Sequence, residues 1–272
     1  MIQDIAPRKF HNEYRPNACP ADDSPVLSFK GKDLLVRVNG DKIEFPKACC
    51  FDKKNLVYAF AVDDTEYFLD RIGQSVVIDG FDYLNVRAFR QFAGNEYGLI
   101  AFTGTHLHQW YSENRFCGRC ASVTVHSETE RALHCPCCGR NIYPHIMPAV
   151  IVGVINGDKL LLTKYSTGFK YYALVAGFTE IGETLEETVA REVMEETGLK
   201  VKNIRYYKSQ PWGIVKDLLA GFYCDVDGDT TIKMDENELK LAEWKSRDEI
   251  ELQPDSYSLT NEMMLMFKEG RV

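Results

Sequence analysis

The sequence predicts an α+β protein of several domains, and three observations carry this prediction. Short strand-like runs with turn signals fill residues 1–112, five cysteines crowd into residues 113–145, and strand and helix signals alternate over residues 146–272. We therefore expect an amino-terminal α+β domain, a compact cysteine module and a carboxyl-terminal α/β domain with these bounds.

The composition is that of an ordinary globular protein. The chain has 272 residues, 45% of them hydrophobic and 26% charged, with a formal net charge of -8. The acidic balance argues against a broad clamp on a nucleic-acid backbone, although carboxylates holding a divalent metal could still bind a polyanion locally. The longest apolar runs are strand-sized and the amino terminus lacks the apolar core of a secretory signal, so we expect a cytoplasmic protein without a membrane partner.

The amino-terminal domain is predicted from local patterns. Asn39-Gly40 lies between the runs DLLVRV and DKIEF and predicts a hairpin turn, and NLVYAFAV predicts a further strand. The end of the segment 85–110 has a helical pattern, so His106 and His108 are expected on a helix face and not as ligands. No catalytic constellation is evident, and we interpret the domain as one that supports or dimerises the rest.

The cysteine module has the spacing of a metal site. Cys117-x-x-Cys120 is followed, after fourteen residues, by Cys135-x-x-Cys138. Each pair presents two thiolates from a turn, and a hairpin between the pairs brings the turns together, which suits tetrahedral zinc. The spacing predicts a structural zinc ribbon.

Two other uses of these cysteines are less consistent with the pattern. A redox pair needs only one CxxC, and a catalytic zinc keeps an open position that four cysteines would close. Cys137 is expected to be a bystander, although His134 could replace one ligand. Gly118 and Gly139 lie where the turns are expected to need small residues. A ribbon can also bind nucleic acid, but the surrounding charge is mixed.

The third domain contains a predicted strand, loop and helix. Residues 171–177 predict a buried strand that ends in glycine, and Gly182 marks a turn. Thr184 and Glu187 have the spacing of a capping box that starts a helix, and Gly198 follows its last turn. The apolar stripe that would face the core consists of Leu185, Val189 and Val193.

This helix carries a group of acidic side chains. Glu192, Glu195 and Glu196 fall within about 100° of one another around the helix axis. Like charges this close destabilise a helix, whereas bound Mg²⁺ or Mn²⁺ would reverse that cost. Arg191 is spaced to orient the carboxylate of Glu195. A solvated acidic face without function is the alternative for the helix taken alone.

The complete pattern resembles the Nudix box, so residues 146–250 resemble a Nudix hydrolase domain. The fixed positions are Gly177, Glu183, Arg191, Glu192, Val193, Glu195, Glu196, Gly198 and Leu199. The resemblance implies an α/β/α sandwich around a mixed sheet. It also implies metal-dependent hydrolysis of a nucleoside diphosphate linked to another group.

Three features resemble the NADH pyrophosphatase subfamily. A four-cysteine ribbon directly precedes the domain, Tyr143-Pro144 leads into PAVIVGV, and the motif SQPW at 209–212 follows the box by ten residues. The resemblance implies cleavage of NADH or NAD⁺ into NMN(H) and AMP, removal of NAD caps from RNA and a homodimer. The chain departs from the family after SQPW, where GIVKD at 213–217 replaces a stretch with two prolines and an aromatic residue.

The resemblance also implies roles for individual residues. Arg191, Glu192, Glu195 and Glu196 are expected at the catalytic centre, and Glu195 and Glu196 are not distinguished as general base. The expected ligands of Mg²⁺ or Mn²⁺ are the carbonyl of Ala176 and the side chains of Glu192, Glu195, Glu196 and Glu238. The expected substrate contacts are Glu130, Tyr143, Phe178, Gln210, Trp212 and Asp217. The expected zinc ligands are Cys117, Cys120, Cys135 and Cys138.

Two other functions stay open from the sequence. One is a Nudix hydrolase for ADP-ribose or a dinucleoside polyphosphate, which the altered segment 213–217 favours. The other is a nucleotide-sensing or RNA-binding module with vestigial catalysis. The intact glutamates of the box argue against this second alternative.

Overall fold

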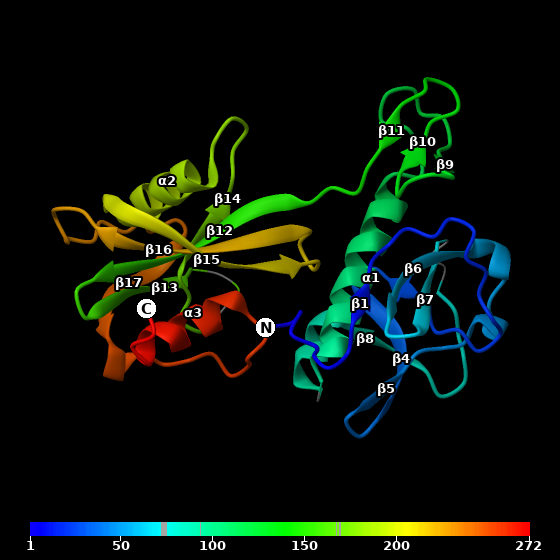
Figure 1. The fold of residues 1–272 in the computed structure, drawn as a ribbon, viewed down its shortest axis with the longest axis horizontal. Coiled ribbons are helices and arrows are strands. Elements are labelled where there is room, and N and C mark those ends of the chain that lie inside the picture. The colour runs from blue at the N-terminus through cyan, green and yellow to red at the C-terminus, as the bar shows by residue number, and fades with distance from the viewer. Residues whose placement is uncertain (72–74, 93, 167, 169) are drawn as a thin grey trace. The chain divides into compact units, whose positions relative to one another are not determined.

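A computed structural model describes residues 1–272 except 72–74, 93, 167 and 169. The chain forms two compact units (Figure 1). The amino-terminal unit contains Ile2–His145 together with the loop Gly213–Lys216, and the carboxyl-terminal unit contains Met1, Ile146–Trp212 and Asp217–Val272. Mixed sheets and few helices place the chain in the predicted α+β class. The further division at residue 112 stays a prediction.

The carboxyl-terminal unit is built on a six-stranded mixed sheet. Its order is β15-β16-β12-β13-β17, with β14 also paired to β12. β12 runs parallel to β16, and the other pairs are antiparallel. The bounds are β12 Met147–Asn156, β13 Lys159–Tyr165, β14 Val175–Phe178, β15 Val201–Trp212, β16 Asp217–Val226 and β17 Leu239–Ser246.

Two helices cover opposite faces of this sheet, α2 (Leu185–Thr197) and α3 (Leu259–Lys268) (Figure 1). A short 3₁₀ helix, η4 (Arg247–Glu249), follows β17. The layers are therefore helix, sheet and helix, as the sequence led us to expect.

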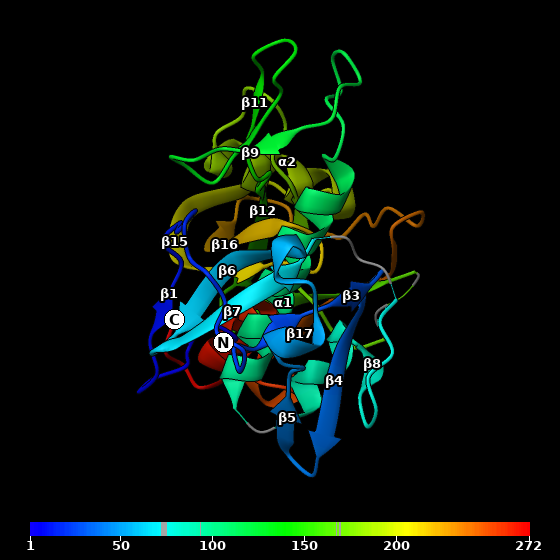
Figure 2. The ribbon, with the colours of Figure 1, turned by 90° about the vertical axis from the view of Figure 1, so that its right-hand side faces the viewer.

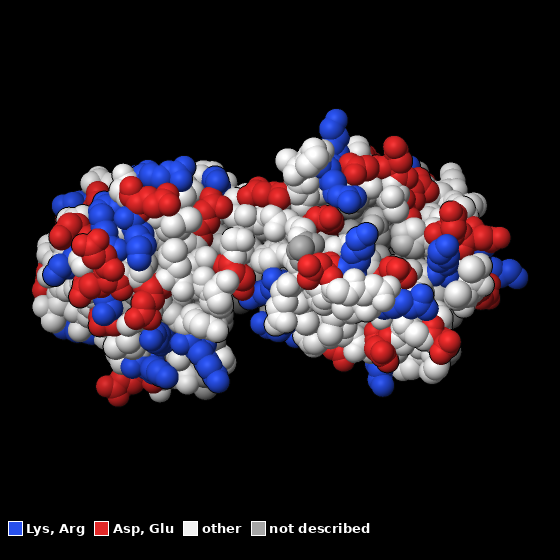
Figure 3. Space-filling model, turned by 90° about the horizontal axis from the view of Figure 1, so that it is seen from below, with Lys and Arg blue, Asp and Glu red and all other residues white. Residues whose placement is uncertain are grey.

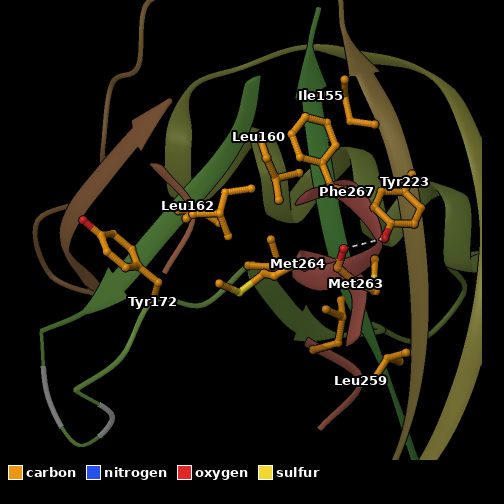
Figure 4. Close-up of a cluster of buried hydrophobic side chains, with 12 residues drawn as sticks. Ile155, Leu160, Leu162, Tyr172, Tyr223, Leu259, Met263, Met264 and Phe267 are labelled. Carbon is orange, nitrogen blue, oxygen red and sulfur yellow. Dashed lines mark hydrogen bonds between the residues drawn. The ribbon is translucent and has the colours of Figure 1, made fainter. Parts of the chain in front are cut away.

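Side chains along β12 alternate between the two layers, as a strand requires. Val150, Val152 and Val154 pack with Val189 and Val193 of α2. The residues of the opposite face pack with α3 in the cluster drawn in Figure 4: Ile151, Ile155, Leu160, Leu162, Tyr223, Met263, Met264 and Phe267 are among its members. In this cluster the Tyr223 hydroxyl donates a hydrogen bond of 2.7 Å to the Met263 carbonyl, so the buried hydroxyl is satisfied.

The predicted helix begins and ends as its sequence indicates. Thr184 and Glu187 form the capping box, with the side chain of each accepting from the backbone N–H of the other. Gly198 terminates the helix in the left-handed conformation, with φ of 70°. Val189 and Val193 are fully buried, and Leu185 is partly buried. Local capping chemistry therefore fixes both ends of α2.

The prediction of a continuous strand over 171–177 was wrong at its start. Ala173 exchanges two backbone hydrogen bonds with Thr163 of β13, and the ladder of β14 with β12 begins only at Val175. β12 and β13 are paired only near their shared turn, so β14 bonds to β12 where the two strands have separated. The strand also continues past Gly177 to Phe178.

The amino-terminal unit has two four-stranded sheets and one long helix. The orders are β1-β6-β7-β2 and β3-β4-β5, with β8 paired to β4. The bounds are β1 Phe10–His11, β2 Val26–Leu27, β3 Phe29–Lys30, β4 Asp33–Asn39, β5 Lys42–Glu44, β6 Leu56–Val62, β7 Thr65–Asp70, β8 Asp82–Asn85 and α1 Asn95–Glu113. Three short 3₁₀ helices are η1 Ala48–Cys50, η2 Lys53–Asn55 and η3 Val86–Gln91.

A small three-stranded sheet of order β11-β10-β9 follows α1 and lies beyond its carboxyl-terminal end (Figures 1 and 2). Its strands are β9 Val125–His126, β10 Leu133–His134 and β11 Asn141–Ile142. β9 and β10 form the hairpin between the two cysteine pairs, and β11 follows the second pair. The cysteine module therefore has the small antiparallel sheet of a ribbon.

The local predictions for this unit are confirmed. Asn39 pairs with Lys42 across the predicted hairpin turn, and Gly40 has φ of 59°. His106 and His108 lie on α1. His108 stacks on Phe29 at 4.9 Å between ring centroids, and His106 Nε2 bonds to a backbone carbonyl at 2.7 Å, so both histidines make packing contacts. Within the described residues, no helix is long and apolar enough to cross a membrane.

Candidate metal and substrate sites

The four predicted zinc ligands lie together. The sulfur atoms of Cys117, Cys120, Cys135 and Cys138 are all within 4.8 Å of one another. Cys117 and Cys138 are 3.6 Å apart, and Cys120 and Cys135 are 3.4 Å apart. A tetrahedral zinc with sulfur bonds of about 2.3 Å separates its ligands by about 3.8 Å, so the quartet fits structural Zn²⁺.

The turns around the quartet explain the neighbouring residues. Gly139 has φ of 72°, so the second turn needs a glycine. Gly118 has an ordinary backbone and open space around it, and the prediction that it must be small was wrong. Cys137 is exposed. His134 lies outside the quartet, with Nδ1 hydrogen-bonded to Asn141 at 2.8 Å.

Arg191 organises the carboxylates of the box helix. Its Nε and Nη2 donate to the two oxygens of Glu183 at 2.6 and 2.9 Å. Its Nη1 donates to Glu192 at 2.7 Å and to Glu195 at 3.0 Å, and Nη2 also donates to the Phe178 carbonyl at 2.8 Å. The contact predicted between Arg191 and Glu195 is therefore present. The guanidinium lowers the pKa of Glu183 to about 2.

Glu196 differs from the other carboxylates of the helix because its side chain is buried. Its side chain is buried, and within the described residues neither oxygen has a hydrogen-bond partner. Burial and the nearby charges of Glu238 and Glu192 raise its pKa to about 8. A buried carboxylate beside two others is costly without a cation, so this donor set fits a divalent metal ion.

The segment after β16 brings Glu238 towards the helix. Asp235 N–H donates to the Glu196 carbonyl at 3.0 Å, and Lys233 N–H donates to the Thr197 carbonyl at 2.8 Å. Asp235 is a further charge that raises the pKa of Glu196, and sequence reasoning missed it. The acidic run DENE at 235–238 could have indicated this residue, but the sequence predicted a metal-binding role only for Glu238.

Gly177 leaves room for a carboxylate. A β carbon at this position would overlap the carboxyl group of Glu192. A side chain on β14 at this position would therefore displace the Glu192 carboxylate from the place that it occupies. This contact explains the fixed glycine of the box, for which the sequence suggested only the end of a strand.

The box carboxylates are more spread out than the cysteines. Among the described histidines, cysteines and acidic residues, the cysteine quartet is the group of three or more whose ligand atoms all lie within 4.8 Å. Glu195 and Glu238 are exposed, Glu192 is half-buried and Glu196 is buried. Glu195 and Glu196 therefore differ in burial, a difference that their spacing in the sequence did not reveal.

The predicted substrate residues of the carboxyl-terminal unit have different environments. Phe178 is 49% exposed and available for stacking. Trp212 and Asp217 are cross-strand neighbours of β15 and β16. Asp217 is buried, and burial raises its pKa to about 7. Gln210 is fully buried, so its side chain serves the packing of this unit. Its amide donates to the Tyr257 carbonyl at 2.6 Å and accepts from a backbone N–H at 2.8 Å.

The other two predicted substrate residues lie in the amino-terminal unit and contact each other. The Tyr143 hydroxyl donates to the Glu130 carboxylate at 2.9 Å. The loop Gly213–Lys216 packs in the same unit, where Lys216 pairs with Glu113 at 2.6 Å. A β carbon at Gly213 would overlap the backbone of Phe102. The departure from the family motif therefore has a structural use, since the loop packs against α1.

Comparisons with known proteins agree with this architecture. The NUDIX domain profile matches residues 145–264, and the profile of the NADH pyrophosphatase zinc ribbon domain matches residues 112–143. The crystal structure of a NUDIX hydrolase from Nitrosomonas europaea superposes with a TM-score of 0.50 at 21% identity, over 58% of this chain and 92% of that one. The sandwich is thus a Nudix fold.

Curated relatives give the same result. A protein of Photorhabdus laumondii named NAD-capped RNA hydrolase NudC is 37% identical over 183 residues, 66% of this chain and 71% of the relative. A protein of the same name from Pectobacterium atrosepticum is 40% identical over 169 residues, 61% of this chain. The chain covers slightly less than two thirds of that second relative, 65% of its length. The chain belongs to the Nudix hydrolase family, and the resemblance to its NADH pyrophosphatase subfamily is confirmed.

Proposed function

We propose that the protein hydrolyses the pyrophosphate bond of NADH and NAD⁺, giving NMN(H) and AMP. Water oxygen forms a bond to one phosphorus while the bond from that phosphorus to the bridging oxygen breaks. The same bond joins an NAD cap to an RNA 5′ end, so we include removal of NAD caps. The relatives named NAD-capped RNA hydrolase support this substrate class.

The observation that carries the proposal is the buried, unpartnered carboxylate of Glu196 in a chain that also has the NADH pyrophosphatase zinc ribbon. With Glu192, Glu195, Glu238 and the Ala176 carbonyl, Glu196 is proposed to hold Mg²⁺ or Mn²⁺. The ion would neutralise the pyrophosphate and polarise phosphorus.

The residues around the metal ligands have their own proposed roles. Arg191 fixes the carboxylates of Glu192 and Glu195 through hydrogen bonds of 2.7 and 3.0 Å. Glu196 is the candidate for accepting the proton of the attacking water, because its carboxylate oxygens have no hydrogen-bond partner within the described residues, whereas Glu195 is bonded to Arg191. Glu195 is exposed and bonded to Arg191, which favours a supporting role.

Substrate binding is proposed to use aromatic faces and polar side chains. Phe178 and Tyr143, each 49% exposed, would stack on the substrate rings. Glu130, Trp212 and Asp217 are proposed polar and ring contacts. The remaining predicted contact, Gln210, has its amide occupied within the unit, so its proposed effect on substrate is through the position of β15.

Product analysis tests the function. The purified protein is incubated with NADH, NAD⁺, ADP-ribose and an NAD-capped RNA, each with Mg²⁺ or Mn²⁺, and products are identified by mass. We expect NMNH and AMP from NADH, and a loss on the order of 100-fold or more in Glu196→Gln. Glu186→Gln is the matched control, since Glu186 is an exposed residue of the same helix. Full activity of Glu196→Gln would overturn the mechanism.

A second substrate is favoured by one observation. The loop after Trp212 lacks the family's prolines, and its Lys216 is engaged by Glu113. A looser nucleotide contact would let ADP-ribose or a dinucleoside polyphosphate compete. Comparable kcat/KM for NADH and ADP-ribose would favour this alternative, and binding without hydrolysis of any substrate would favour a sensing module.

The proposal for RNA is limited to its 5′ end. Lys and Arg side chains are interspersed with Asp and Glu on the face drawn in Figure 3, and the net charge is -8. We also propose a homodimer, as the resemblance implies, which light scattering would test by mass. The cytoplasmic location predicted from the sequence stays a prediction.

A further inference from the structure

Two cavities in the amino-terminal unit are lined by residues to which no role has been assigned above. The first has a volume of about 170 Å³ and is lined by Arg71, Arg115 and Phe116 among others. The second has a volume of about 320 Å³. Both cavities are lined by Tyr111 and His126, so these two side chains lie between them. The second volume reaches the size range of small-molecule sites.

The first cavity has unpaired positive charge at its rim. Arg71 and Arg115 are exposed, and within the described residues neither side chain has an ion pair or hydrogen bond. Exposed Phe116, at 58%, offers an aromatic face beside them. Two free guanidinium groups next to an aromatic face are the recognition elements for a phosphate attached to a base.

Unsatisfied polar atoms lie close to the second cavity. Its wall includes Tyr58, a buried residue whose hydroxyl has no hydrogen-bond partner within the described residues. The guanidinium of Arg131 lies within electrostatic range of Tyr58 and Tyr111. Its Nη2 donates to the Ala59 carbonyl at 2.8 Å, whereas its buried Nη1 has no partner in the described part of the chain. Such donors are costly unless a ligand or solvent meets them.

The acidic side chains near the two cavities do not cancel the positive charge of Arg71, Arg115 and Arg131. Glu66 is paired with Arg15 at 2.6 Å, and exposed Glu128 is the acidic residue that lines the second cavity. Burial and the charge of Arg71 lower the pKa of His126 to about 4, so its ring is neutral at pH 7. Arg71, Arg115 and Arg131 therefore leave an excess of positive charge in a chain whose net charge is -8.

We propose that the first cavity binds the phosphate of a nucleotide, with Arg71 and Arg115 on the phosphate and Phe116 against the base, and that the second cavity extends the site beyond Tyr111 and His126. The ligand is either a free nucleotide or a nucleotide within an RNA chain, and both present the same phosphate and ring. The site goes beyond the proposed hydrolase activity, since its lining residues are distinct from the metal ligands and substrate contacts proposed above.

Calorimetric titration tests the proposal without hydrolysis. The full-length, zinc-loaded protein is titrated with AMP and with a short, uncapped 5′-phosphorylated oligoribonucleotide, in buffer without added divalent cations. The variant is Arg71→Ala with Arg115→Ala. The matched control is Arg119→Ala with Arg140→Ala, which removes two exposed arginines of the cysteine turns and leaves both cavities unchanged.

We expect the affinity to fall about tenfold for each cavity arginine removed and to stay unchanged in the control. For the oligoribonucleotide, the slope of log affinity against log salt should fall by about 1.4. Arg71→Lys with Arg115→Lys should keep most of the affinity and confirms the role of charge if the alanine variant folds poorly. A loss of affinity for AMP in the alanine variant identifies a free nucleotide as the ligand. A loss of affinity for the oligoribonucleotide alone identifies RNA as the ligand. Equal affinity of variant and wild type, equal loss in the control, or no binding of either probe overturns the proposal.

Discussion

Arg191 and Glu183, eight residues apart, are joined by two hydrogen bonds, from Nε at 2.6 Å and from Nη2 at 2.9 Å. This two-point contact fixes the plane of the guanidinium. Its remaining nitrogen then reaches Glu192 and Glu195 in a set direction. Glu183 thus positions the carboxylates of Glu192 and Glu195 through Arg191, although it lies before the helix.

The first prediction concerns this positioning. Glu183→Gln should lower kcat by about 10- to 100-fold with a smaller effect on KM, because supporting contacts of metal ligands have effects of that size. Steady-state kinetics with NADH over a range of Mg²⁺ concentrations measures both parameters. Glu186→Gln, on the exposed face, should retain wild-type kinetics. Equal rates for the two variants would contradict the role of Glu183.

The second prediction concerns the contact between strand and helix. Gly177→Ala places a methyl group where the Glu192 carboxylate lies, so this carboxylate must move. We expect activity to fall about 100-fold or more, since small displacements of catalytic groups have effects of this size. The circular dichroism spectrum should stay unchanged. Gly118→Ala, at a position with open space, should be neutral and is the control.

The third prediction is a dependence of stability on pH. Burial raises the pKa of Asp217 to about 7 in the folded protein, whereas an unfolded aspartate titrates at about 3.9. The folded state therefore holds the proton more tightly. The contribution of Asp217 to the free energy of unfolding is greatest below about pH 4 and falls as the pH rises to about 7, by at most about 1.4 kcal/mol per pH unit.

Urea unfolding between pH 4 and 8 measures this effect. Asp217→Asn keeps the shape of the side chain and removes the titration, so its stability should depend less on pH and exceed that of the wild type at pH 8. Asp23→Asn, at an exposed position, should follow the wild-type curve. Parallel curves for wild type and Asp217→Asn would show that the carboxyl group is not protonated in the folded state.

The fourth prediction concerns the zinc. Cys135→Ser removes a buried ligand, so the protein should contain less than one zinc ion per chain and unfold at a lower temperature. Cys137→Ser changes an exposed cysteine outside the quartet and should keep both zinc and stability. Elemental analysis and thermal melting decide between these outcomes. Equal zinc content in the two variants would contradict the assignment of the ligands.

The features predicted most accurately from the sequence are those with local causes. The box helix was placed correctly because its capping box and its terminal Gly198 act within one turn of the helix. The cysteine quartet was predicted because each CxxC is itself a turn and the distance between the pairs suits one hairpin. Spacing is sufficient wherever the interacting groups are close in the chain.

The features that were missed depend on contacts between distant segments. The segment 171–177 looks uniformly apolar, but it bonds first to β13 and then to β12, which no local pattern records. Asp235 joins the charges around Glu196 only because its backbone bonds to the end of α2. The unequal burial of Glu195 and Glu196 likewise depends on what packs over the helix.

Strand β12 presents its valines to the helix that carries the box and its isoleucines to the opposite helix. Substitutions on these two faces have few shared neighbours, so their effects on unfolding should add. A redesign of the methionine-rich layer of α3 for heat resistance would therefore need to keep only its contact with Ala176, which packs against that layer and carries the carbonyl proposed as a metal ligand. The same independence gives natural sequences a route by which tolerance to temperature and choice of substrate evolve at separate rates.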